Sequence, residues 1–166
     1  MKKLLFGERE VTSNGDEVKL GTVINLRGVK AGTFDESKPV LKNDYTVFTT
    51  LPSIDTRVCD LQILRLAEIS KEYAEFNYVS FSLDLPTALA SYLTEHQVGE
   101  IQMFSDYLDK KVSKETNLLV NELQLMNRSV FILDKDNKVV YKQINKQIRE
   151  NIDFERLVEA MEKISK

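Results

Sequence analysis

The chain contains one cysteine, Cys59, and the residues before it place it where a cysteine can be reactive. The β-branched, aromatic segment 45–50 predicts a core strand, Pro52 ends it, and a helix is expected over about 58–76. Cys59 then lies in the first turn of that helix, where free N–H groups and the positive end of the helix dipole favour an anion. Because the thiolate is the nucleophilic form of cysteine, this position predicts a reactive sulfur.

Thr56 precedes Cys59 by three residues, so its hydroxyl can share a face with the sulfur. Spacing alone leaves two interpretations open. A lone cysteine is often an inert, buried, small hydrophobic residue, whereas Thr-x-x-Cys at a helix start favours an activated thiolate beside a hydroxyl. Disulfide exchange through Cys-x-x-Cys is disfavoured, because Thr56 occupies the first position of that motif.

The elements around this site predict a mixed α/β fold. A second strand over 78–83 follows the helix, and the order strand, helix, strand implies a right-handed crossover between parallel strands. At the N-terminus, Asn14-Gly15 predicts a type I′ turn that joins strands over 11–12 and 18–20 in a β-hairpin. The remaining expected elements are a helix from about Pro86, a short strand over 101–104, hairpin strands over 129–133 and 139–144, and a C-terminal helix with Asp153 as N-cap.

Composition narrows the classes of protein. A length of 166 residues with 42% hydrophobic and 30% charged residues fits one globular domain, expected over 1–166. The net charge of −3 argues against nucleic-acid binding. No apolar run approaches the roughly 18 residues of a membrane span, and residues 7–10 interrupt the signal-like start. A single cysteine favours a reducing compartment, here the cytoplasm. Because His96 has no cysteine or second histidine as a partner, we expect no bound metal, and we expect no cofactor.

The segment Pro52-Ser53-Ile54-Asp55-Thr56-x-Val58-Cys59 resembles the active-site signature of the peroxiredoxin superfamily, specifically of its bacterial thiol peroxidase branch. Segments 82–86 and 103–107, and Arg128 at the start of the strand over 129–133, fit the same branch. The similarity runs from about residue 45 to 164. It implies a thioredoxin-like fold, with a central mixed β-sheet flanked by helices, and a thiol-dependent peroxidase.

The resemblance implies roles for four residues. Cys59 would attack the terminal peroxide oxygen and become a sulfenic acid. Thr56 would hydrogen-bond the peroxide, and Pro52 would pack over the sulfur and limit its contact with water. Arg128, which lies 69 residues after Cys59, would stabilise the thiolate and the departing oxygen.

The chain departs from the branch at the position of a second, resolving cysteine, which Leu93 occupies. No internal disulfide can form, so the resemblance implies resolution by an external thiol, either a thioredoxin-like protein or a low-molecular-weight thiol. Arg57 adds a charge beside the site, and the region before Tyr45 is short. The resemblance also suggests a homodimer.

Two hypotheses remain. The first is a one-cysteine peroxidase that reduces hydrogen peroxide and alkyl hydroperoxides. The second is a non-catalytic relative that serves as a peroxide sensor or a binding module.

Overall fold

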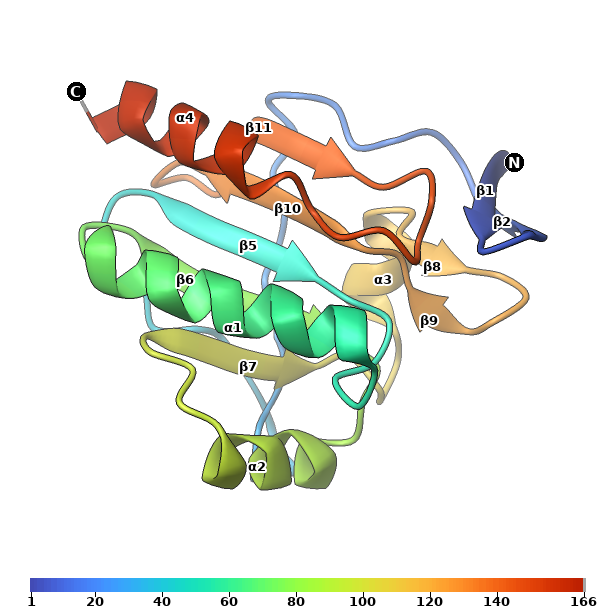
Figure 1. Ribbon diagram of the computed structural model, residues 1–166, viewed down its shortest axis with the longest axis horizontal. Coiled ribbons are helices and arrows are strands. Elements are labelled where there is room, and N and C mark those ends of the chain that lie inside the picture. Colours follow the sequence, from blue (N-terminus) through green and yellow to red (C-terminus); the bar gives the residue numbers. More distant parts are fainter. Residues whose placement is uncertain (166) are drawn as a thin grey trace.

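A seven-stranded mixed sheet forms the centre of the protein, with strand order β11-β10-β5-β6-β7-β3-β4 (Figure 1). The computed structural model describes residues 1–165. Strands β5, β6 and β7 are parallel to one another, and the others pair antiparallel. The strands are β3 (Gly28–Lys30), β4 (Glu36–Ser37), β5 (Thr46–Thr50), β6 (Asn77–Ser82), β7 (Ile101–Ser105), β10 (Ser129–Leu133) and β11 (Val139–Ile144).

The sheet is covered on both faces, which explains why its central strands are apolar or β-branched rather than alternating. Every residue of β5, β6 and β10 is buried. Neighbouring residues point to opposite faces: Val47 packs with the helices α1, α2 and α4, whereas Phe48 packs with residues 18–26 and α3. The helices are α1 (Arg57–Glu72), α2 (Pro86–Glu95), α3 (Lys111–Glu115) and α4 (Phe154–Ser165).

A smaller antiparallel sheet, of order β1-β2-β8-β9, lies beside the C-terminal end of β5 (Figure 1). Its strands enclose a small core of Leu4, Val11, Val120 and Ile148. The strands are β1 (Lys2–Phe6), β2 (Arg9–Ser13), β8 (Leu119–Val120) and β9 (Leu125–Met126).

The N-terminal hairpin exists, but the predicted position was wrong. Its turn is at Gly7, with φ +67°, between β1 and β2. Asn14-Gly15 follows β2, and residues 18–20 form no strand. The cause is nonlocal: the next pairing of β2 is with β8, through Ser13 and Val120, while Val18 is drawn into the core under the large sheet.

The cysteine-bearing helix begins as predicted but ends earlier. Tyr73 is its C-cap, and Phe76 lies outside it although buried. The chain must reverse there, because the Asn77 N–H already donates to the Tyr45 carbonyl at 2.9 Å to start β6.

The other predicted elements are confirmed, including the cap of α4, where Asp153 accepts a hydrogen bond from Arg156 N at 3.1 Å. Within residues 1–165, no helix is long and apolar enough to cross a membrane.

Candidate active site

Cys59 lies in the first turn of α1, directly after the loop that leaves β5. The loop spans residues 51–56, and Thr56 is the N-cap residue of the helix. The side chain of Cys59 points inward and is 0% exposed. Because β5 is a middle strand of the sheet, its C-terminal end delivers the sulfur to the interior of the protein rather than to an edge.

Arg128, the residue before the neighbouring strand β10, contacts the sulfur. Its Nη1 lies 3.3 Å from Cys59 Sγ and also donates to Gln62 Oε1 at 2.6 Å, while its Nε donates to the Ile148 carbonyl at 2.9 Å. The residue is 2% exposed. The structure therefore brings together Cys59 and Arg128, the pair that the family resemblance implied would meet.

Within residues 1–165, the charge of Arg128 has no carboxylate partner. None of the ion pairs within residues 1–165 includes it. A buried guanidinium without a counter-charge is costly, and neutral oxygens compensate it only in part. Among its contacts within residues 1–165, the sulfur is the one group that can carry a negative charge.

Gln62, which the sequence analysis missed, orients the guanidinium. It is 0% exposed, one turn after Cys59. Its Nε2 donates to Thr49 Oγ1 at 2.7 Å and to the Thr50 carbonyl at 3.1 Å, which leaves Oε1 facing Arg128. A polar residue on the apolar face of a helix, three positions after a reactive cysteine, was the available signal.

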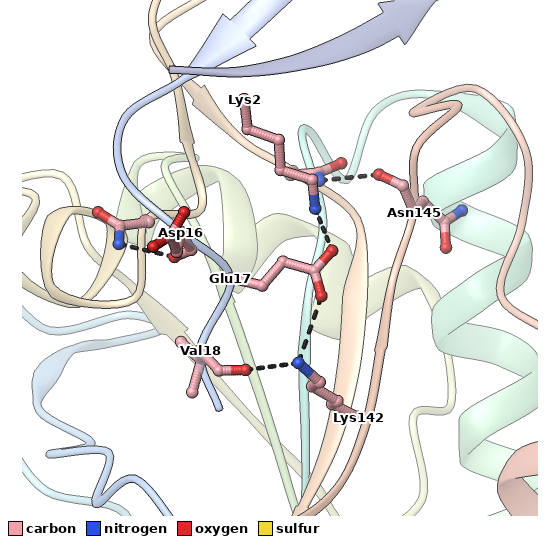
Figure 2. Close-up of polar contacts among 8 residues, drawn as sticks. Lys2, Asp16, Glu17, Val18, Lys142 and Asn145 are labelled. Carbon is pink, nitrogen blue, oxygen red and sulfur yellow. Dashed lines mark hydrogen bonds and ion pairs between the residues drawn. The ribbon is translucent and has the colours of Figure 1, made fainter. Parts of the chain in front are cut away.

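The backbone that carries Arg128 is held between the two sheets. Asn127 Oδ1 accepts from Arg128 N at 2.7 Å, and Asn127 Nδ2 donates to the Asn145 carbonyl at 2.9 Å. Figure 2 shows this Asn145 contact beside Glu17, which Lys2 and Lys142 approach from β1 and β11. The N-terminal segment therefore lies beside the turn from which Arg128 projects.

The two remaining predicted site residues lie in the loop before α1. Pro52 is buried, and Thr56 is exposed. The Thr56 hydroxyl donates to the Ser53 carbonyl at 2.9 Å rather than to the sulfur. Their roles toward a peroxide stay predictions.

A cavity of about 660 Å³ opens beside the start of α1, on the side that faces α2. Across it, Tyr92 donates to Asp60 Oδ1 at 2.6 Å, and His96 stacks on Tyr92 with ring centroids 4.0 Å apart. Burial, then the hydrogen bond to Asp60, raises the pKa of Tyr92 well above its usual value. Among residues 1–165, no group of three or more histidine, cysteine, aspartate or glutamate side chains could hold a metal ion.

Comparison with known proteins decides the family. Residues 23–142 match the model of the AhpC/TSA family. The chain is 31% identical over 167 residues to the thiol peroxidase of Bacillus subtilis (strain 168), with 100% of both chains covered. It belongs to the AhpC/TSA family, as a bacterial thiol peroxidase of the peroxiredoxin superfamily. A thiol peroxidase of Staphylococcus saprophyticus is 31% identical over 172 residues, covering 99% of this chain and 100% of the relative.

Solved structures confirm the thioredoxin-like fold of this AhpC/TSA family member. A peroxiredoxin-like protein from Aquifex aeolicus superimposes with a TM-score of 0.88 at 25% identity, covering 98% of this chain and 97% of the other. The thiol peroxidase from Chromobacterium violaceum superimposes with a TM-score of 0.85 at 17% identity, with the same coverage. The fold class expected from the sequence is therefore confirmed.

Proposed function

We propose that Cys59 is the peroxidatic residue of this thiol peroxidase and that it works with Arg128 in a one-cysteine cycle. The observation that carries the proposal is the buried Arg128 guanidinium, which lies 3.3 Å from the sulfur and has no carboxylate partner within the described chain. The non-catalytic alternative is not favoured, because full-length relatives are thiol peroxidases.

In the first step, the Cys59 thiolate attacks the terminal oxygen of the peroxide. The S–O bond forms as the O–O bond breaks, the leaving oxygen takes up a proton to become water or an alcohol, and the sulfur becomes a sulfenic acid. Negative charge moves from sulfur to oxygen during this step, and the Arg128 donors face that charge without needing to reorganise.

Ionisation alone is not a sufficient explanation of catalysis. An ordinary thiol of pKa ~8.5 is a few per cent ionised near pH 7, so complete ionisation raises the thiolate fraction by only about 10–30-fold. The larger part must come from groups that bind the stretched O–O bond more tightly than the peroxide itself. Arg128 is one such donor.

Thr56 is the second group that we assign to the peroxide. A hydroxyl donates one hydrogen bond and accepts others. Since the Thr56 hydroxyl donates to the Ser53 carbonyl at 2.9 Å, its lone pairs remain available to accept the O–H of a hydroperoxide. Pro52, buried in the same loop, would shield the sulfur from water.

The second half of the cycle needs a thiol from outside. An external thiol attacks the sulfenic sulfur and displaces water, which gives a mixed disulfide. A second thiol then releases the Cys59 thiol and an external disulfide. The cavity of about 660 Å³ beside α1 has room for a small thiol, and a thioredoxin-like protein is the other candidate. We further propose a homodimer and, from the single cysteine, a location in the cytoplasm.

The test is turnover of hydrogen peroxide with dithiothreitol as the reductant, for the wild-type protein and for Cys59→Ser. We expect catalytic turnover that the substitution abolishes, and a mixed disulfide at Cys59 when the thiol is limiting. Thr56→Val should slow the reaction with peroxide by about 10²-fold, the usual effect of losing one such partner. Turnover that survives in Cys59→Ser contradicts the proposal.

A further inference from the structure

One carboxylate outside the predicted site is bonded to the loop before α1. Asp84 follows β6, and its two oxygens accept three hydrogen bonds. Ser53 Oγ donates to Oδ1 at 3.1 Å, Ile54 N donates to Oδ2 at 2.9 Å, and Ser82 Oγ donates to Oδ2 at 2.8 Å. Two of the three donors belong to the loop 51–56, about thirty residues earlier in the chain.

The usual structural use of an aspartate at this point would be to cap α2, which starts with Pro86. The N-cap residue is instead Leu85, which makes no side-chain cap. No ion pair within residues 1–165 includes Asp84. Its carboxylate therefore binds the loop and the adjacent Ser82, and it neither caps α2 nor forms an ion pair within residues 1–165.

The loop passes this restraint on to Thr56. The Ser53 carbonyl accepts hydrogen bonds from Thr56 N at 3.2 Å and from Thr56 Oγ1 at 2.9 Å. Asp84 thus fixes the Ser53 hydroxyl and the Ile54 amide. The Ser53 carbonyl in turn fixes Thr56. One residue, Ser53, links the carboxylate to the threonine hydroxyl.

Asp84 is itself held from the far side. Ser105 Oγ donates to the Asp84 carbonyl, and Asp106 N donates to the Ser82 carbonyl at 2.9 Å, so that the ends of β6 and β7 fix its backbone. A side chain mounted on two paired, buried strands is a rigid support for a loop that has no strand or helix of its own.

We infer that Asp84 is a positioning residue for peroxide reduction, which sets the place of the Thr56 hydroxyl relative to Cys59 through Ser53. The inference rests on the proposed peroxidatic role of Cys59. Displacing a reacting or binding group by about 1 Å can cost about 10²-fold in rate. We expect Asp84→Ala to lower the second-order rate with hydrogen peroxide by that factor.

Two further variants separate positioning from general stability. Asp84→Asn keeps an acceptor for Ile54 N and Ser82 Oγ, and the Ser53 hydroxyl can turn to accept from the new amide, so most of the rate should return. Asp134→Ala is the matched control, because its carboxylate also accepts two hydrogen bonds from a loop backbone, from Asp136 N at 2.9 Å and Lys138 N at 3.0 Å, but at the end of β10 away from Cys59. It should lower the melting temperature and leave the peroxide rate within about threefold, as for a site without catalytic contacts.

A double-mutant cycle tests the route through Thr56. If Asp84 acts on that hydroxyl, Asp84→Ala combined with Thr56→Val should be no more than about threefold slower than Thr56→Val alone, because coupled residues are not additive. Alkylation of Cys59 by iodoacetamide, which needs no peroxide site, should not slow in Asp84→Ala. If alkylation and peroxide reduction fall together, Asp84 acts on the sulfur and the inference is wrong.

Ser53→Ala extends the test should Asp84→Ala fail to fold. It removes one of the two loop contacts and leaves Ile54 N bonded to Asp84, so the peroxide rate should fall by less, about 3–10-fold. In the Thr56→Val background, Ser53→Ala should have no further effect on that rate. Additive effects of Ser53→Ala and Thr56→Val, or an unchanged rate in both Asp84→Ala and Ser53→Ala, overturn the inference. Either result leaves the peroxidase assignment intact, because that depends on loss of turnover in Cys59→Ser.

Discussion

The sulfur of Cys59 lies 3.3 Å from Nη1 of Arg128, although the residues are 69 positions apart. The contact follows from the register of two neighbouring strands. Ser129, the first residue of β10, is paired with Thr50, the last residue of β5. Strand β5, which leads into α1, therefore ends beside the start of β10, and Arg128 is the residue just before β10. A shift of one residue in this pairing would turn Arg128 to the other face of the sheet.

The planar guanidinium of Arg128 should matter as much as its charge. Arg128→Lys keeps the charge but cannot serve Cys59, Gln62 and Ile148 together, because lysine lacks the rigid fork. We expect the second-order rate with hydrogen peroxide, measured by stopped flow, to fall by about 10²-fold. Arg65→Lys is the control, since Arg65 is an exposed residue of α1 paired with Glu68. Equal rates for the two variants would contradict the role of Arg128.

Gln62 should affect both stability and rate. Gln62→Leu removes a partner from the Thr50 carbonyl and from one Arg128 N–H, whereas Thr49 Oγ1 keeps its bond to the Ser129 carbonyl, and each buried group left unpaired costs about 1–3 kcal/mol of unfolding free energy. The freed guanidinium can tilt, so the peroxide rate should fall as well. Gln102→Leu is the control: Gln102 makes two hydrogen bonds to the backbone of Val40, away from the sulfur. Urea unfolding and stopped flow on both variants test this, and an unchanged rate in Gln62→Leu contradicts it.

The sequence was informative where the structural signal is local. Helix α1 was predicted from apolar residues at steps of three and four, strand β5 from its β-branched and aromatic residues, and the hairpin β10–β11 from the turn-forming residues 134–137. The meeting of Arg128 with Cys59 was implied only by the family resemblance, since it depends on strand pairing over 69 residues. Gln62 was missed because a polar residue within a helix is ordinarily assigned to the solvent face.

The N-terminal region shows the opposite case. Asn14-Gly15 is a strong local turn signal, and Gly15 does adopt a positive φ of 68°. The turn nevertheless does not join two paired strands, because Asn117 Nδ2 binds the Asp16 carbonyl at 2.9 Å and the chain then crosses toward Lys142 (Figure 2). These partners lie more than one hundred residues away, so no local pattern could have identified them.

Glu17 should make stability depend on pH in the acid range. Its pKa lies below the ordinary value of 4.5, chiefly because Lys2 donates to its carboxylate, with Lys142 a further partner (Figure 2). A lowered folded-state pKa stabilises the fold above the unfolded value, and that stabilisation is lost as the pH falls through the lowered pKa. Because the side chain is partly exposed, Glu17→Gln should cost only about 0.2–1 kcal/mol at pH 7.

The measurement is urea unfolding from pH 7 down to pH 3 at low and high salt. The difference between wild type and Glu17→Gln should shrink as the pH falls below 4.5 and as salt rises. Glu10→Gln is the control, since Glu10 pairs with Lys3 at 3.4 Å on a more exposed surface. A difference that stays constant over the whole pH range would show that the carboxylate charge of Glu17 contributes nothing.

The fate of oxidised Cys59 should change when a second cysteine is introduced at the family's resolving position. Without a reductant, the wild-type sulfenic acid has no internal thiol to condense with, so excess peroxide should add a second oxygen atom and give the sulfinic acid. Leu93 lies on α2, half-buried against the same core as Cys59. In Leu93→Cys, the sulfenic sulfur should instead form an internal disulfide with loss of water, which resists overoxidation.

Leu61→Cys is the control, because Leu61 is exposed two positions after Cys59 on the same helix and cannot face it. Intact-mass spectrometry during a peroxide titration distinguishes loss of two hydrogen atoms from gain of two oxygen atoms. Sulfinic acid in both variants would mean that α2 cannot bring position 93 to the sulfur.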